Sequence, residues 1–246
     1  MHNFTFNGTS LSNFGGRLLQ PPFHTIAARN KTFEKIYGQS GDEIIDNESY
    51  NNVSFSLKIC FFPMIAQQTA RVLAYSIIDW LAPLQNAYYT YSDTVNPNYF
   101  TKAVITNFDE IKRDLPTLLT ATLKFSRVPF WFRSGGAATI TFTDQALLTN
   151  PEQYTAEQIM TLTYTGEGTL NNIQMLINGN STIFDASAAA PTQLFDNVTK
   201  QHYRIENGSK VYLSAKLPVN LSPGDNLINF STSRISCSIV PNWRRL

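Results

Sequence analysis

The chain has 246 residues, a formal net charge of +1 and 15% charged side chains, against about 25% in ordinary soluble domains. Tight nucleic-acid binding depends on a concentrated basic surface, and the densest basic stretch is only residues 242–246, so we expect no specific DNA or RNA binding. Aromatic residues make up 13% of the chain and alternate with uncharged polar ones, which predicts an all-β protein.

The start of the chain lacks a basic stretch followed by an apolar one, which predicts no secretion signal. No apolar run approaches the ~20 residues that span a bilayer, so we expect no membrane contact. Cys60 and Cys237 neither require nor exclude a disulfide, and reduced thiols are the simpler interpretation. Cys237 lies between Ile235 and Ile239 in an alternating run, which predicts a small buried side chain.

Residues 36–52, IYGQSGDEIIDNESYNN, gather four acids behind two glycines. A calcium loop needs acids at alternate positions around a central glycine, whereas Gly41 precedes every acid here. A pair of catalytic carboxylates must face one cleft, whereas neighbours such as Asp42 and Glu43 point to opposite sides of an extended chain. We therefore expect a solvated connecting loop.

Alternation of apolar and polar residues predicts strands at residues 53–61 and 119–126. Residues 64–82 break this pattern, because their apolar side chains have helical spacing between Pro63 and Pro83. The apolar side chains at this spacing are Ile65, Val72, Leu73, Ile77, Trp80 and Leu81. They predict one amphipathic helix that covers a sheet. The inward side chains expected from the two strands are Val53, Phe55, Leu57, Ile59, Phe61, Leu119, Ala121, Leu123 and Phe125.

Residues 86–93, NAYYTYSD, place three tyrosines within four positions. They could stack on a sugar or contact a protein. Because successive side chains of a strand alternate in direction, Tyr88, Tyr89 and Tyr91 cannot all point inward, which favours an outer partner-binding surface.

The glycine pair in residues 132–138 marks the expected domain boundary. We expect residues 1–134 to form a β-sandwich with a helix near 64–82, and residues 135–246 to form a second β-sandwich or jelly roll. The final strand is expected to return to the N-terminal domain.

Signatures of catalysis are missing from the sequence. The three histidines do not have zinc-ligand spacing, and neither a Gly-x-Ser-x-Gly elbow nor a phosphate loop occurs. We expect no enzyme activity, no catalytic residues, no metal site and no cofactor.

Five short motifs follow one another from the opening FTFNG to the closing VPNWRRL, and the pattern is weakest over residues 146–219. Their residues are Phe4, Phe6, Asn7, Gly8, Gly38, Gly41, Asp42, Tyr50, Trp80, Leu81, Pro223, Gly224, Asn226, Pro241 and Trp243. Taken in this order, the motifs resemble the distal tail proteins of siphophages, which are hub subunits at the tail tip.

The resemblance implies a virion protein of the tail tip, made in the bacterial cytoplasm. Its N-terminal domain would close as a homo-hexameric ring, stacked or single, around a channel for DNA. Its partners would be the tail tube protein, the tail-associated tip protein and the receptor-binding or baseplate proteins. The C-terminal domain would be galectin-like, although the His-x-Asn-Pro-Arg and Trp-x-x-Glu-x-Arg strands with which true galectins bind sugar are absent here.

In such a ring, one patch meets a different patch on the neighbour, and residues 36–52 are suited to reach across that seam. The expected subunit or tube contacts are Gly38, Gly41, Asp42, Glu43, Asp46, Glu48 and Tyr50. The alternative function is a carbohydrate-binding module for cell-wall polysaccharide that uses Tyr88, Tyr89, Tyr91 or Trp131. A glycan-active enzyme is a third and weaker alternative.

Overall fold

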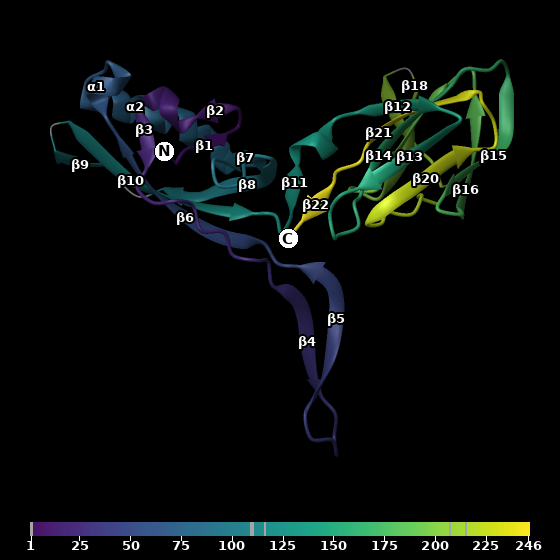
Figure 1. The fold of residues 1–246 in the computed structure, drawn as a ribbon, viewed down its shortest axis with the longest axis horizontal. Coiled ribbons are helices and arrows are strands. Elements are labelled where there is room, and N and C mark those ends of the chain that lie inside the picture. Colours follow the sequence, from purple (N-terminus) through teal and green to yellow (C-terminus); the bar gives the residue numbers. More distant parts are fainter. Residues whose placement is uncertain (1, 109–110, 116, 207, 215) are drawn as a thin grey trace. The chain divides into compact units, whose positions relative to one another are not determined.

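The computed structural model describes residues 2–108, 111–115, 117–206, 208–214 and 216–246. The chain is built mainly of strands (Figure 1), which confirms the all-β expectation. It divides into two compact units, Met1–Trp131 with Leu246 and Phe132–Arg245. The division falls inside β11 (Trp131–Arg133), whereas the sequence placed it a few residues later.

The main sheet of the first unit has the strand order β2-β1-β7-β8-β10-β6-β3, with β9 paired to β10. The pairings along this path are antiparallel. Its strands are β1 (Phe4–Phe6), β2 (Thr9–Ser10), β3 (Gly16–Leu18), β6 (Val53–Phe61), β7 (Tyr89–Asp93), β8 (Tyr99–Phe108), β9 (Lys112–Leu115) and β10 (Leu118–Arg127). A separate two-stranded sheet consists of β4 (Arg29–Lys35) and β5 (Asp42–Tyr50).

β6 and β10 supply the floor of the first core. Their register sets Leu57 opposite Leu123 and Phe55 opposite Phe125. Each inward side chain predicted for these two strands is 9% exposed or less, so the alternation identified the buried face correctly.

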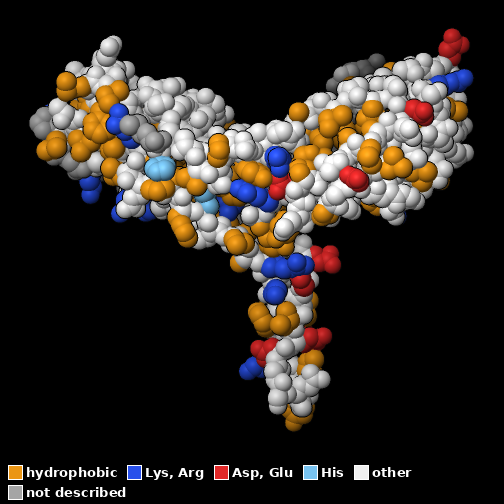
Figure 2. Space-filling model, in the orientation of Figure 1, with side chains coloured by type: hydrophobic (Ala, Val, Ile, Leu, Met, Phe, Trp, Pro, Cys, Tyr) orange, Lys and Arg blue, Asp and Glu red, His pale blue; other side chains and the backbone are white. Residues whose placement is uncertain are grey.

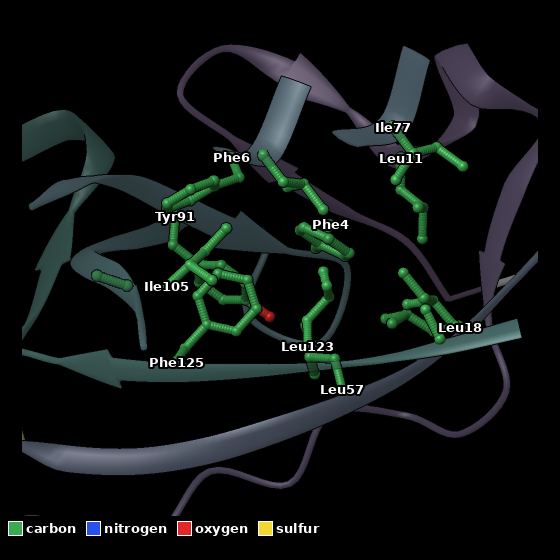
Figure 3. Close-up of a cluster of buried hydrophobic side chains, with 14 of the residues drawn as sticks. Phe4, Phe6, Leu11, Leu18, Leu57, Ile77, Tyr91, Ile105, Leu123 and Phe125 are labelled. Carbon is green, nitrogen blue, oxygen red and sulfur yellow. The ribbon is translucent and has the colours of Figure 1, made fainter. Parts of the chain in front are cut away.

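The sheet folds over, so that β1 and β7 pack on β10 and the two halves act as a sandwich (Figure 3). The ring centroids of Phe6 and Phe125 are 5.3 Å apart, and those of Tyr91 and Phe125 are 5.7 Å apart. The first contact is edge-to-face and the second is tilted, and such aromatic contacts add to the burial of the rings themselves. An aromatic cluster therefore joins strands that are not neighbours in the sheet.

The predicted helix is two helices, α1 (Pro63–Ala66) and α2 (Ala70–Leu81). Gln67 has φ of 52°, which ends α1, and the Thr69 hydroxyl accepts a hydrogen bond from Val72 N and begins α2. Leu73, Ile77 and Leu81 of α2 are buried on the sheet, as expected. Ile65 and Val72 were also expected on the apolar face that packs on the sheet. That expectation is wrong, because these side chains are 54% and 52% exposed.

The second unit is a sandwich of two antiparallel sheets around one core. One sheet has the order β12-β21-β14-β17-β18-β19 and the other β13-β20-β15-β16. Cys237 lies in this core, and both cysteines are buried and unpaired with each other. The strands are β12 (Ile140–Thr143), β13 (Gln145–Asn150), β14 (Ile159–Tyr164), β15 (Thr169–Ile177), β16 (Asn180–Ser187), β17 (Thr192–Asp196), β18 (Gln201–Glu206), β19 (Ser209–Tyr212), β20 (Gly224–Phe230) and β21 (Ile235–Val240). The remaining elements of the chain are β22 (Arg244–Arg245) and the 3-10 turns η1 (Leu11–Phe14), η2 (Ala82–Gln85) and η3 (Ser134–Ala137).

Candidate interaction surface

Residues 36–52 were expected to form a connecting loop. This expectation is wrong, because most of them form one strand of a β-hairpin. β5 pairs with β4 in a register that sets Phe33 opposite Ile44 and Lys35 opposite Asp42. The turn between them contains Gly38 and Gly41 at φ of 84° and 107°. Both glycines have open space around them, so the left-handed backbone, and not crowding, favours glycine here.

The hairpin exposes apolar side chains on both of its faces. Phe33 and Ile44 are 62% and 57% exposed on one face, and Ile45 on the other face is 38% exposed. At the turn, Tyr37 is fully exposed. Figure 2 shows apolar side chains along the hairpin among charged ones. An isolated two-stranded ribbon is marginally stable in water, so these side chains indicate a surface that another protein covers.

An ion pair joins the two strands of the hairpin. The Arg29 guanidinium binds the Asp46 carboxylate, and Asp46 Oδ1 also accepts a 2.9 Å hydrogen bond from Glu48 N. The hydrogen bond from Arg29 lowers the pKa of Asp46, and the same bond raises the pKa of Arg29. Glu48 has φ of 52°, which fits a local irregularity of the strand. The hairpin still carries five acidic and three basic side chains, a net negative charge.

Buried polar contacts fix the segment that leads into the hairpin. Arg127 is 1% exposed and donates to the carbonyl oxygens of Thr25, Val128 and Pro129 at 2.8–2.9 Å. Burial lowers the pKa of Arg127 to about 10, so the side chain stays charged at neutral pH. Its guanidinium carbon lies 5.3 Å from the centre of the Trp131 ring.

A second anchor joins the same segment to β7. His24 Nε2 lies 2.6 Å from Asp93 Oδ2, which also accepts a 3.1 Å hydrogen bond from the Tyr91 hydroxyl. Burial raises the pKa of Asp93, but the hydrogen bond and electrostatic attraction from His24 and the backbone hydrogen bonds from Val95 and Asn96 together outweigh it, and the net shift is downward. At the hairpin base, Asn51 N donates to Ala28 O at 2.9 Å. The base is therefore held firmly while the rest of the hairpin is exposed.

The three tyrosines predicted as an outer surface do not form one. Tyr91 is completely buried, so its assignment is wrong: β7 is an inner strand, and its inward face points into the aromatic cluster. Burial raises the pKa of its hydroxyl well above the ordinary value. Tyr89 is partly buried on that cluster, with its hydroxyl 2.9 Å from Asn86 Oδ1. Tyr88 is 45% exposed and accepts a hydrogen bond from Asn52.

Several exposed apolar residues escaped the sequence analysis. Phe23 and Ile26, in the segment before β4, are 83% and 76% exposed, and Phe33 and Ile44 were not singled out. Ile44 and Ile45 are adjacent among acids, so one of them must face outward on any strand. That pair was the available signal.

The described residues contain neither a cluster of metal-binding side chains nor a membrane-spanning helix. Among the described residues, no group of three or more His, Cys, Asp or Glu side chains could hold a metal ion. No helix of the described chain is long and apolar enough to cross a membrane.

Comparison with known proteins gives matches only at the level of structure. No family model and no curated protein sequence matches this chain. The SPP1 Dit (gp 19.1) protein, described as a paradigm of the hub adsorption apparatus in phages that infect Gram-positive bacteria, matches with a TM-score of 0.69 at 11% identity. The match covers 100% of both chains. This chain has the Dit fold.

A second solved structure supports the same conclusion. A chain of the phage P2 baseplate in its activated conformation with Ca matches with a TM-score of 0.51 at 10% identity, covering 100% of this chain and 98% of that one. The resemblance found in the sequence is thus confirmed at the level of the Dit fold, although few residues are shared.

Proposed function

We propose that the protein is a structural hub subunit of a phage tail tip and that its first unit closes with five copies into a hexameric ring. Two observations support the proposal: the Dit fold over the whole chain, and a firmly based hairpin that exposes apolar side chains on both faces. A ring seam of an obligate assembly buries more than about 2,000 Å² and would cover such a hairpin.

The seam is heterologous, so the hairpin needs a different patch on the neighbouring copy. We propose the outer face of α1 and α2 as that patch. Met64, Val72 and Tyr75 are 77%, 52% and 55% exposed there, beside a groove that Arg71 and Arg113 line. Apolar side chains flanked by two guanidinium groups complement a hairpin that is apolar and net negative.

Assembly can be tested by substituting Phe33→Asp and Ile44→Asp together. The fold should persist, because both side chains are exposed, while rings disappear in light scattering and in micrographs taken with tail tube and tip proteins added. The control is Leu147→Asp, an exposed apolar residue of the second unit that should leave rings intact. Rings formed by the double variant would refute the role of the hairpin.

The receiving patch can be tested by disulfide cross-linking. Phe33→Cys combined with Val72→Cys should give a ladder of up to six linked chains under oxidation. Phe33→Cys combined with Leu147→Cys should not. Background linkage is expected to be low because Cys60 and Cys237 are buried. Equal ladders from the two pairs would reject α1 and α2 as the receiving face.

The carboxylates of the hairpin are proposed to face partly toward the channel, where a negative wall repels phosphate and lets DNA slide. Asp46 is neutralised by Arg29, which leaves Asp42, Glu43 and Glu48 as the main contributors. Changing all four acids to Lys should slow DNA ejection from assembled virions. Ejection at the wild-type rate from normal rings would remove this part of the proposal.

The second unit is proposed to point outward and hold receptor-binding or baseplate proteins, while the ring joins the tail tube and the tip protein. The function is geometric, without catalysis, specific nucleic-acid binding or membrane contact, and the protein resides at the virion tail tip after synthesis in the host cytoplasm. The alternative sugar platform at the tyrosines loses support, because Tyr91 and Trp131 are buried.

A further inference from the structure

The hairpin of β4 and β5 is attached to the rest of its unit at its base. The rings of Tyr50 and Phe130 lie 5.5 Å apart in an edge arrangement, and Asn51 N donates to Ala28 O. In the described chain, the hydrogen bonds and ion pairs of residues 31–48 join the hairpin to itself. No side chain of β4 or β5 is buried. The two strands are therefore held by each other and not by a core.

The charges of cross-strand neighbours affect how firmly the two strands pair. On one face of the hairpin, Lys35 lies opposite Asp42, a pair of opposite charges. On the other face, Glu34 lies directly opposite Glu43. Like charges in directly opposite positions destabilise the pairing of strands, whereas exposed pairs of opposite charge stabilise it little. The half of the hairpin next to the turn therefore contains a repulsive contact that its attractive contact barely offsets.

Pairing of the two strands also restricts their backbone. In β6, the burial of every second side chain offsets this loss of conformational freedom, and β4 and β5 lack that gain. The turn contains Gly38 and Gly41, and glycine loses more freedom on ordering than any other residue. Two-stranded ribbons on their own are marginally stable at best in water. The paired form and an open form with separated strands therefore have similar free energies in a subunit without neighbours.

We propose that the hairpin is open in much of the population of free subunits and closes into the paired form when a second copy of the chain covers it. This inference rests on the hub function proposed above, in which a neighbouring copy buries the exposed side chains of Phe33 and Ile44. That burial supplies the stabilisation that the free hairpin lacks. The repulsion between Glu34 and Glu43 favours the open form before assembly.

Opening of the hairpin regulates assembly. A subunit binds its neighbour through the closed form, so its apparent affinity is reduced in proportion to the closed fraction. Two free subunits therefore associate weakly, and rings form where the tail tube or tip proteins concentrate the subunits. The bond from Arg127 to Thr25 O holds the segment that leads into the hairpin, so an open hairpin stays attached at the seam.

Hydrogen exchange of the unassembled full-length chain measures the opening. Amides of β4 and β5 should exchange within about tenfold of the rate of an unstructured peptide, whereas amides of β6 should be protected more than about a thousandfold. The amide of Asn51, which bonds to Ala28 O at the base, is the internal control and should be protected. If β4 and β5 were protected as strongly as β6, the proposal would be overturned and the hub function would be untouched.

The closed form can be locked by a disulfide across the repulsive pair. Directly opposite residues of antiparallel strands lie within disulfide reach, so oxidation of the variant with Glu34→Cys and Glu43→Cys should join the two strands. Cys60 and Cys237 are buried, and non-reducing electrophoresis checks that the link lies within one chain. With tube and tip proteins present, the oxidised variant should form rings at a concentration about threefold to tenfold lower than the reduced variant.

The reduced variant is the matched control, because it has the same side chains and lacks only the link. Equal concentrations for ring formation in the two forms would overturn the regulatory role of the hairpin. Rings in neither form would instead contradict the hub function, and the exchange measurement would still decide whether the hairpin opens.

A charge reversal tests the repulsive pair itself. Glu34→Lys places opposite charges across the two strands, and it should slow the exchange of the β4 and β5 amides about twofold to tenfold. Glu167→Lys, the same change at an exposed residue of the second unit, is the control and should leave that exchange unaltered. Exchange that is the same in the wild type and the Glu34 variant would overturn the role of the two glutamates.

Discussion

β5 and β6 are consecutive strands of nine residues, separated only by Asn51 and Asn52, yet their surroundings are opposite. β6 buries every second side chain in the aromatic core, whereas no side chain of β5 is buried. Both strands contain isoleucine and aromatic residues. The comparison teaches that strand formation and burial are separate matters: β6 has a folded sheet to pack on, and β5 has only β4.

The largest effect is expected from a substitution in the aromatic core to which β6 contributes. Phe125→Ala removes a ring that packs on Phe4, Phe6, Phe55 and Tyr91, and it should lower the free energy of unfolding by about 3–5 kcal/mol. Phe33→Ala on the hairpin should leave that free energy unchanged within about 0.5 kcal/mol. Denaturant unfolding of the unassembled protein measures both. Equal losses would mean that the hairpin is part of the core.

The next effect concerns the base of the hairpin. Arg127→Met should lower the free energy of unfolding by about 2–4 kcal/mol, because buried carbonyl oxygens lose their donor. Hydrogen exchange at the Asn51 amide, which bonds to Ala28 O, should quicken at the same time. Lys58→Met, on an exposed position of β6, is the control. Unchanged exchange in the Arg127 variant would show that the base is held by other contacts.

The second unit offers the reverse contrast, a polar side chain placed inside a core. The folded-state pKa of His202 is about 4, below its ordinary value of 6.5, so the unfolded chain takes up a proton at a higher pH than the folded chain. The stability that the neutral ring contributes is complete above about pH 6.5 and is lost as the pH falls toward 4. Between pH 7 and pH 5 we expect a loss of about 1–2 kcal/mol.

Thermal unfolding at the two pH values checks this expectation. His202→Phe should remove that part of the pH dependence, while His2→Phe should keep it. A pH dependence that is identical in the wild type and the His202 variant would show that the ring does not remain neutral in the fold.

The smallest effect belongs to the exposed ion pair of the hairpin. Asp46→Asn removes the partner of Arg29, but both side chains are solvated, so the unfolding midpoint of the unassembled protein should not move measurably. Added salt should likewise not change the difference between the midpoints of the wild type and the variant. A clear drop in the midpoint would show that the hairpin unfolds together with the core. The hairpin would then contribute to the stability of the unit, as β6 does.

Much of the main sheet of the first unit was predictable, because its longer strands turn one face into a core. The alternation in β6 and β10 gave the inward residues correctly, and α2 buries the expected Leu73, Ile77 and Leu81. The helix was predicted too long because Gln67 adopts a left-handed backbone that no periodicity announces. Tyr91 was misplaced because periodicity identifies the faces of a strand and not which face is covered.

The candidate sites were harder to predict. The hairpin was expected to be a loop, since adjacent Ile44 and Ile45 hide any alternation, and its pairing with β4 depends on a register that only the fold displays. The burial of His202 was likewise not visible in the sequence. Gln193, His202 and Asp185 are separated along the chain, and only the meeting of two sheet edges gathers them.

By itself the sequence determined the all-β class, the buried faces of β6 and β10 and the resemblance to tail hub proteins. These follow from composition, local periodicity and short motifs. Only the tertiary structure decided that β5 is an exposed strand, that Tyr91 is buried and that His202 is buried in the second sandwich. The physical reason is that burial depends on what packs against a side chain, and the packing partners are distant in the chain.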